Sequence, residues 1–265
     1  MPVPPPSARF STGAPGAPIV RDRPWWGLGD VALAMPVIIA FSLAAGVLGG
    51  IVVTLTSEDG FSLSGDAELP IAFLAISTIG QQLGQIVWPW AVSKWKGFGM
   101  RRDWRWGFEP ADIGLGLGLG LLAQFAAYLV SLGVSALVGL ENESDADNTQ
   151  ILTDAEGSPW LWVMVGIVVL GAPLSEEILF RGLVLRAFEK RGGKILAVLG
   201  STILFSVVHY TGAGADGTLV LLSSIGVVGL VLGIGAIVFD RLGPGIIAHM
   251  AFNLVGTAVA LEWIG

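Results

Sequence analysis

The 265-residue sequence predicts an all-α, polytopic transmembrane helical bundle of about seven spans, within a range of six to eight. Hydrophobic residues make up 53% of the chain and charged residues 13%, against roughly 25% charged residues in an average soluble domain. Mean hydropathy is +0.74. This composition excludes an ordinary soluble protein and a disordered chain, and it lacks the basic face of a nucleic-acid binder. The expected surroundings are therefore the lipid bilayer, with no nucleic-acid partner.

Seven stretches are long enough to cross a bilayer, because a helical span needs about 20 mostly apolar residues. They cover residues 31–55, 69–92, 112–138, 160–188, 194–212, 217–239 and 244–263. The fourth contains Pro173, which predicts a kink or a tilt. Residues 1–24 are rich in Pro, Ala, Gly and Ser and lack a signal-peptide apolar core, so we expect a disordered tail there.

The basic residues fall on one side of this seven-span topology. Every Lys and Arg except Arg181 lies in the tail, in a loop on that side or at the adjoining end of a span, whereas the opposite loops carry acidic residues and no Lys or Arg. The positive-inside rule then predicts a multi-pass protein of the cell membrane, with its N-terminus in the cytoplasm and its C-terminus outside. The ten Trp residues lie near predicted span ends, as in an aromatic belt.

Glycine pairs spaced four apart predict where helices pack closely. Two such pairs lie in the third span, Gly114 with Gly118 and Gly116 with Gly120. Small residues at this spacing allow transmembrane helices to approach one another.

Polar residues inside the spans indicate a functional site, because an ionisable side chain there costs roughly 2.5–3.5 kcal/mol on insertion scales. The chain has no Cys and only two His, and both His residues belong to this set. The set consists of Glu176, Glu177 and Arg181 in the fourth span, Phe205 and His209 in the fifth, and His249 and Asn253 in the seventh.

Helical spacing assigns first roles to these residues. Glu177 and Arg181 are four apart and can form an ion pair, for which we favour a mainly structural role. Glu176 is then the less neutralised carboxylate, which suits a general base.

The histidines have similar helical partners. His249 and Asn253 are four apart and can face one cavity, and Phe205 can form a wall beside His209. Their depths along the spans overlap without coinciding, and a lone His in a span could serve only to bond a neighbouring helix. The whole group at similar depth favours one shared reactive site.

The three motifs Glu-Glu-x-x-x-Arg, Phe-x-x-x-His and His-x-x-x-Asn, each in its own apolar segment, carry a family resemblance. In this order they resemble the CAAX protease and bacteriocin-processing (CPBP, or Abi) family of intramembrane proteases, which includes the type II CAAX prenyl endopeptidases. The resemblance covers about residues 155–260. It implies a catalytic transmembrane core over residues 151–265, and it leaves the transmembrane helices of residues 25–150 without an assigned role.

The resemblance implies an intramembrane endopeptidase that hydrolyses a peptide bond in a membrane-associated protein or peptide. By this resemblance, Glu176 and His209 would activate the attacking water, and His249 with Asn253 would stabilise the oxyanion. The residue types agree, since amide hydrolysis needs a base and donors aimed at developing negative charge. Two other interpretations stay open: a non-catalytic immunity or adaptor protein of the same family, and a proton-coupled transporter. Polar groups that cluster only in the second half argue against the transporter.

The cofactor is left open by the residues. If a metal is present, Glu176, His209 and His249 would be its ligands, as in a His2Glu zinc site. The chain has no His-Glu-x-x-His helix, and we favour a metal-free glutamate mechanism. The oligomeric state is not indicated. Ten Arg to four Lys in a chain rich in Pro, Gly and Ala suits a GC-rich bacterial genome.

Overall fold

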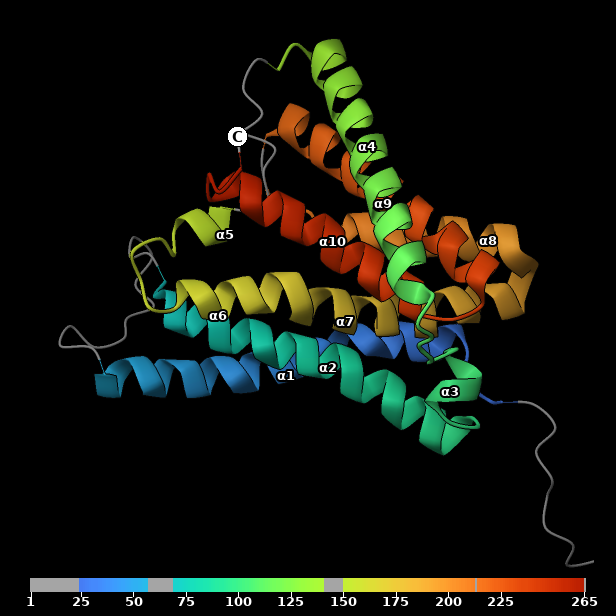
Figure 1. The fold of residues 1–265 in the computed structure, drawn as a ribbon. Helices are drawn as coiled ribbons and strands as arrows, with labels where there is room; N and C mark the ends of the chain where they lie inside the picture. Colours follow the sequence, from blue (N-terminus) through green and yellow to red (C-terminus); the bar gives the residue numbers. More distant parts are fainter. Residues whose placement is uncertain (1–23, 57–68, 141–149, 213, 265) are drawn as a thin grey trace, which may run out of the picture.

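The structure is a computed structural model that describes residues 24–56, 69–140, 150–212 and 214–264. These residues fold into helices, and no strand occurs among them (Figure 1). The predicted tail over residues 1–24 falls almost wholly outside the described residues. The same is true of most acidic residues predicted for the outer loops, which belong to residues 57–68 and 141–149.

Six helices in the described part of the chain are long and apolar enough to cross a membrane, judged by length and composition. They are α1 (Leu28–Thr56), α2 (Ile71–Lys96), α4 (Asp112–Val138), a continuous run over Leu161–Val207, α9 (Ala215–Phe239) and α10 (Gly243–Ala260). Two short helices, α3 (Met100–Asp103) and α5 (Gln150–Thr153), lie between them. The prediction of an all-α polytopic bundle is confirmed.

The run over Leu161–Val207 has 47 residues, about twice the length that one crossing needs. It turns back at Gly192 and Gly193, whose backbone angles are not helical, and Gly193 has a φ of +77° that favours glycine. The Ser201 hydroxyl donates to the Phe180 carbonyl at 3.0 Å, so the two arms lie side by side. The hairpin therefore supplies the fourth and fifth predicted spans, and a count of about seven holds.

The first arm of this hairpin is not a regular α-helix. It passes through α6 (Leu161–Gly166), the π-helix η2 (Ile167–Gly171), α7 (Ala172–Glu176) and the π-helix η3 (Glu177–Val184), before α8 (Leu185–Val207) begins. Pro173 follows η2, and it cannot donate to the carbonyl four residues back. At Pro173, where the sequence predicts a kink or a tilt, the helix changes its hydrogen-bond register. Such π-helical turns are frequent at functional sites.

The hairpin's first arm lies in the middle of the bundle. Figure 1 shows α1, α2 and the α6–α7 arm side by side, with α10 and α9 on the other side of that arm and α4 crossing α9 and α10. All eight residues of η3 are buried. Many large apolar side chains on the outer faces of α1 and α4 are exposed, as expected for helices that face lipid.

Of the two glycine pairs predicted in the third span, close helix packing is confirmed for one. A Cβ atom on Gly116 would lie 2.5 Å from Ile247, and one on Gly120 would lie 2.8 Å from the Ala248 carbonyl, so α4 approaches α10 closely. Gly114 and Gly118 have nothing within 4 Å, and their predicted packing role is wrong. The reason is geometric, since residues two apart in a helix point about 200° apart.

An ion-pair cluster joins the beginnings of α4 and α10. Arg241 donates from Nε to Asp112 at 2.8 Å, and its NH2 lies 3.2 Å from Glu109. The hydrogen bond to Asp112 raises the pKa of Arg241 above its ordinary value. This cluster fixes the starting point of α10, the helix that carries His249.

Two tryptophans depart from the predicted aromatic belt. Trp26 and Trp104 lie at the basic end of the bundle as expected, but both are buried, with ring centroids 4.7 Å apart. Trp104 Nε1 donates to the Pro89 carbonyl at 2.9 Å. These rings bind segments of the protein together, whereas Trp25 and Trp95 are exposed as belt residues would be.

Candidate active site

The structure brings Glu176 and both histidines together from three separate segments. Glu176 ends α7, His209 lies two residues after the end of α8, and His249 lies inside α10. Glu176 Oε2 is 3.9 Å from His209 Nε2 and 3.8 Å from His249 Nε2. One oxygen of the Glu176 carboxylate therefore lies near the Nε2 atoms of both imidazole rings.

The orientation of His209 is set by its own turn. Its Nδ1 lies 2.7 Å from the carbonyl oxygen of Phe205, and a carbonyl can only accept, so Nδ1 carries the hydrogen. Nε2 is then left for Glu176 and for anything bound beside it. The Phe205 ring packs against both imidazoles, with its centroid 4.8 Å from that of His209 and 5.8 Å from that of His249.

The Glu177–Arg181 pair also has a contact that the spacing did not reveal. Glu177 Oε1 lies 3.0 Å from Arg181 NH1, and both side chains are 0% exposed. The same oxygen lies 3.2 Å from Nδ1 of His249. Arg181 in turn donates to the Gly229 carbonyl at 3.2 Å and lies over the Phe205 ring at 4.3 Å. Arg181 thus connects η3 to α9, and Glu177 connects it to His249 of α10.

Asn253 contacts the backbone of the arm that carries Glu176. Its Nδ2 donates to the Val168 carbonyl at 2.8 Å. That carbonyl lacks a helical partner, because the Ala172 N–H bonds to Ile167 and Pro173 has no N–H to offer. Asn253 therefore fills a gap that Pro173 leaves, and one of its two amide hydrogens remains for another acceptor.

A cavity of about 850 Å³ lies in front of Glu176 and His209. Its walls come from α1, α2, η3 and α8, and they are mostly apolar. Polar groups on the α2 side include Gln81 and Gln85, and the Ser175 hydroxyl donates to Gln85 Oε1 at 2.7 Å. The helices of residues 25–150 thus form half of this cavity, a contribution for which the sequence held no motif.

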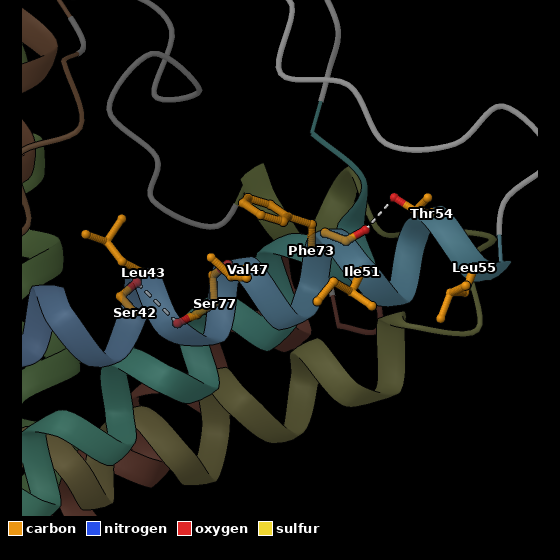
Figure 2. Close-up of a pocket in the computed structure, with 10 residues that line it drawn as sticks. Ser42, Leu43, Val47, Ile51, Thr54, Leu55, Phe73 and Ser77 are labelled. Carbon is orange, nitrogen blue, oxygen red and sulfur yellow. Dashed lines mark hydrogen bonds between the residues drawn. The ribbon is translucent and has the colours of Figure 1, made fainter.

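A second apolar hollow of about 620 Å³ follows α1 away from this cavity. Figure 2 shows it between α1 and α2, from Ser42 and Leu43 at one end to Thr54 and Leu55 at the other. The two spaces share Ser42 and Leu43. An apolar path therefore leads from Glu176 along α1.

The residues considered as metal ligands lie together, but not in a ready-made metal site. Within the described ranges, no group of three or more His, Asp and Glu residues is placed to hold a metal ion. Glu176, His209 and His249 nevertheless supply the donor types that zinc takes.

Comparison with known families agrees with these observations. Residues 158–255 match the Rce1-like family, described as type II CAAX prenyl endopeptidase Rce1-like. The match includes all seven residues of the three motifs, and it confirms the resemblance to CAAX proteases. No curated protein and no solved structure matches the chain.

Proposed function

We propose that this multi-pass membrane protein is a CAAX-type intramembrane protease with a specific hydrolytic mechanism, on the basis that residues 158–255 match the Rce1-like family. The substrate is a peptide bond in a membrane-associated protein or peptide. The observation that carries the proposal is the position of Glu176 Oε2, less than 4 Å from Nε2 of both histidines and on the wall of an apolar cavity.

In this mechanism, Glu176 and His209 activate the attacking water. Their 3.9 Å separation is too long for a direct hydrogen bond, but one water can bridge such a gap. Glu176 takes the proton of the water while its oxygen attacks the carbonyl carbon of the scissile bond. His209 Nε2 can accept a hydrogen bond from the same water because its hydrogen lies on Nδ1. The C–N bond then breaks as the proton passes from Glu176 to the leaving amine.

His249 is the donor for the developing oxyanion. We assign this role to the doubly protonated ring: Nδ1 donates to Glu177, and Nε2, which lies 3.8 Å from Glu176 Oε2, donates to the reacting carbonyl. The second amide hydrogen of Asn253 is the other donor that we assign to the oxyanion. Donors that are held in place before the reaction stabilise such charge most effectively. Glu177 and Arg181 act as positioning residues through His249, and the Phe205 ring packs against both imidazoles.

The apolar walls favour a substrate with an apolar segment. The cavity and the hollow of Figure 2 together leave space along α1 for such a segment while its peptide bond lies at Glu176. Residues 151–265 then form the catalytic core, and residues 25–150 supply the α1–α2 wall. We also propose that the protein lies in the cell membrane, with its N-terminus in the cytoplasm and its C-terminus outside.

The test is cleavage of a panel of short lipidated and unlipidated peptides by the purified protein in detergent. Glu176→Gln should lower the cleavage rate at least about 100-fold, because it removes the general base while keeping the side-chain shape. Glu156→Gln, an exposed carboxylate in the same half of the chain, is the matched control and should cleave normally.

Normal cleavage by Glu176→Gln would refute the mechanism. Absence of cleavage by the folded protein, with cellular function intact in Glu176→Gln, would favour an immunity or adaptor role instead. A chelator added to the active protein decides the cofactor, since a metal-free reaction keeps its rate.

A further inference from the structure

A separate cavity of about 480 Å³ lies at the basic end of the bundle, away from Glu176. Four basic residues line it: Arg102, Arg105, Arg186 and Lys190. Two of them follow α2 and two lie on the arm that continues from η3 into α8. Its volume falls within the roughly 300–1,000 Å³ of small-molecule sites. It is an open cavity at the surface, and its lining comes from two separate parts of the chain.

The charge of this cavity is positive. Asp103 and Glu189 are the acidic residues in its lining, so four basic minus two acidic side chains leave a balance of +2. Asp240, outside the lining, lies 3.2 Å from Arg105 and 3.4 Å from Arg186 and lowers the balance to +1. One monoanionic phosphodiester would neutralise it.

Both acidic residues of the lining already have partners. Asp103 accepts hydrogen bonds from the N–H groups of Phe98 and Gly99, at 2.6 and 2.9 Å. Glu189 accepts one from Arg186 at 2.8 Å. These carboxylates shape the cavity and leave its excess of positive charge in place.

The basic side chains are held in position by other parts of the protein. Arg186 is only 6% exposed and donates to the Ala236 carbonyl at 3.1 Å. Lys190 donates to the carbonyls of Pro24 and Trp26, both at 2.7 Å. Arg102 lies over the Phe98 ring at 4.1 Å and has no carboxylate partner among the described residues. Arg102 is therefore the base that is most available to a ligand.

The surroundings place this cavity at the level of lipid headgroups. Trp25 and Trp95 are close in sequence to residues that line the cavity, and they are 67% and 68% exposed. Trp residues are enriched at membrane–water interfaces. Basic pockets between transmembrane helices bind anionic headgroups. From these observations we infer that the cavity binds the phosphate headgroup of an anionic phospholipid. The inference is independent of whether the protein cleaves peptides.

A headgroup in this cavity would bridge the two regions that form the Glu176 cavity. Trp26, which precedes α1, packs on Trp104, and Trp104 lies against Gly182 of η3. Lys190 already connects the α8 arm to the chain before α1. Bound phosphate would add a charged contact at the same junction.

The test is binding of phosphatidylglycerol to the purified protein in a non-ionic detergent, measured by native mass spectrometry. Phosphatidylcholine with the same acyl chains, inorganic phosphate and glycerol phosphate serve as separate competitors. Phosphatidylglycerol should bind saturably, and each of the three competitors should be at least about tenfold weaker. Arg102→Gln should weaken phosphatidylglycerol binding about fivefold, the effect of roughly one interfacial basic residue.

Arg101→Gln is the matched control, because Arg101 is an exposed neighbour with the same charge that does not line the cavity. It should bind phosphatidylglycerol as the unmodified protein does, with an unchanged melting temperature for both variants. If the two substitutions weakened binding equally, diffuse surface charge and not the cavity would account for lipid binding, and the inference would be overturned. Equal binding of phosphatidylcholine, or competition by inorganic phosphate as strong as that of the lipid, would overturn it as well.

Discussion

The η3 segment and the α1–α2 pair face each other across the Glu176 cavity, but their side chains are held in different ways. Every residue of η3 is buried, and its charged groups are fixed by Glu177–Arg181, by His249 and by the Gly229 carbonyl. The cavity-facing residues of α1 are nearly all apolar, and the Ser42 hydroxyl bonds to the Ser77 carbonyl of α2 at 3.3 Å. Reacting atoms need fixed positions, whereas an apolar wall needs only the right shape. Substitutions on the two sides should therefore differ in kind.

The largest effect on folding is expected for Arg181→Met. This change removes the cationic partner of the buried Glu177 carboxylate and leaves it only the contact with His249, which should lower the free energy of unfolding by about 3–5 kcal/mol. Thermal unfolding in detergent measures the effect, with Arg191→Met at an exposed position as the control.

A double variant separates stability from positioning. Glu177→Leu with Arg181→Met removes both charges and should regain much of the stability. It should remain a poor enzyme, because His249 has lost the partner of its Nδ1. A stable Arg181→Met protein, or a double variant with normal kcat, would contradict this account of the η3 side.

An intermediate effect is expected at Asn253. Asn253→Ala leaves the Val168 carbonyl without a donor and should cost about 1–3 kcal/mol. In a Pro173→Ala background the backbone regains an N–H in that turn, so the same substitution should cost clearly less. A double-mutant cycle of melting temperatures tests this coupling. Equal costs in both backgrounds would show that Asn253 does not act on the Pro173 gap.

The activity of these variants adds a second readout. If Asn253 also donates to the oxyanion, its replacement lowers kcat even where Pro173→Ala has restored stability. Recovery of kcat together with stability would leave Asn253 with a structural role alone.

The smallest effect is expected on the α1 wall. Ala32→Trp fills part of the cavity and should raise KM at least about tenfold, with kcat nearly unchanged, because it removes substrate binding rather than chemistry. Ala40→Trp lies on the same helix, outside both the cavity and the hollow, and should leave both constants alone. A fall in kcat without a change in KM would mean that α1 takes part in chemistry.

Much of the fold followed from local pattern, because a span is defined by its own residues. The apolar stretches gave the helices, and the two glycines at 192 and 193 separate the arms of the hairpin that was predicted as two spans. The candidate site followed from the cost of polar groups in lipid, which singled out Glu176, His209 and His249. These three residues do lie together.

The relations between helices could not be predicted in the same way. Spacing shows which residues share a face of one helix, but not how that helix is rotated against its neighbours. The Glu177–His249 contact joins residues 72 apart, and the Asn253–Val168 bond depends on a π-helical turn that changes the register. The α1–α2 wall was missed because apolar cavity walls and lipid-facing surfaces have the same composition.

The central claim is that Glu176 acts as a base toward water and does not attack the substrate itself. The most direct measurement is cleavage in ¹⁸O-labelled water over many turnovers, followed by mass spectrometry of the product and of the protein digested to peptides. A general base puts the label into the new carboxylate of the product and leaves the peptide containing Glu176 unlabelled. Label in the Glu176 side chain would reveal a covalent intermediate and contradict the mechanism.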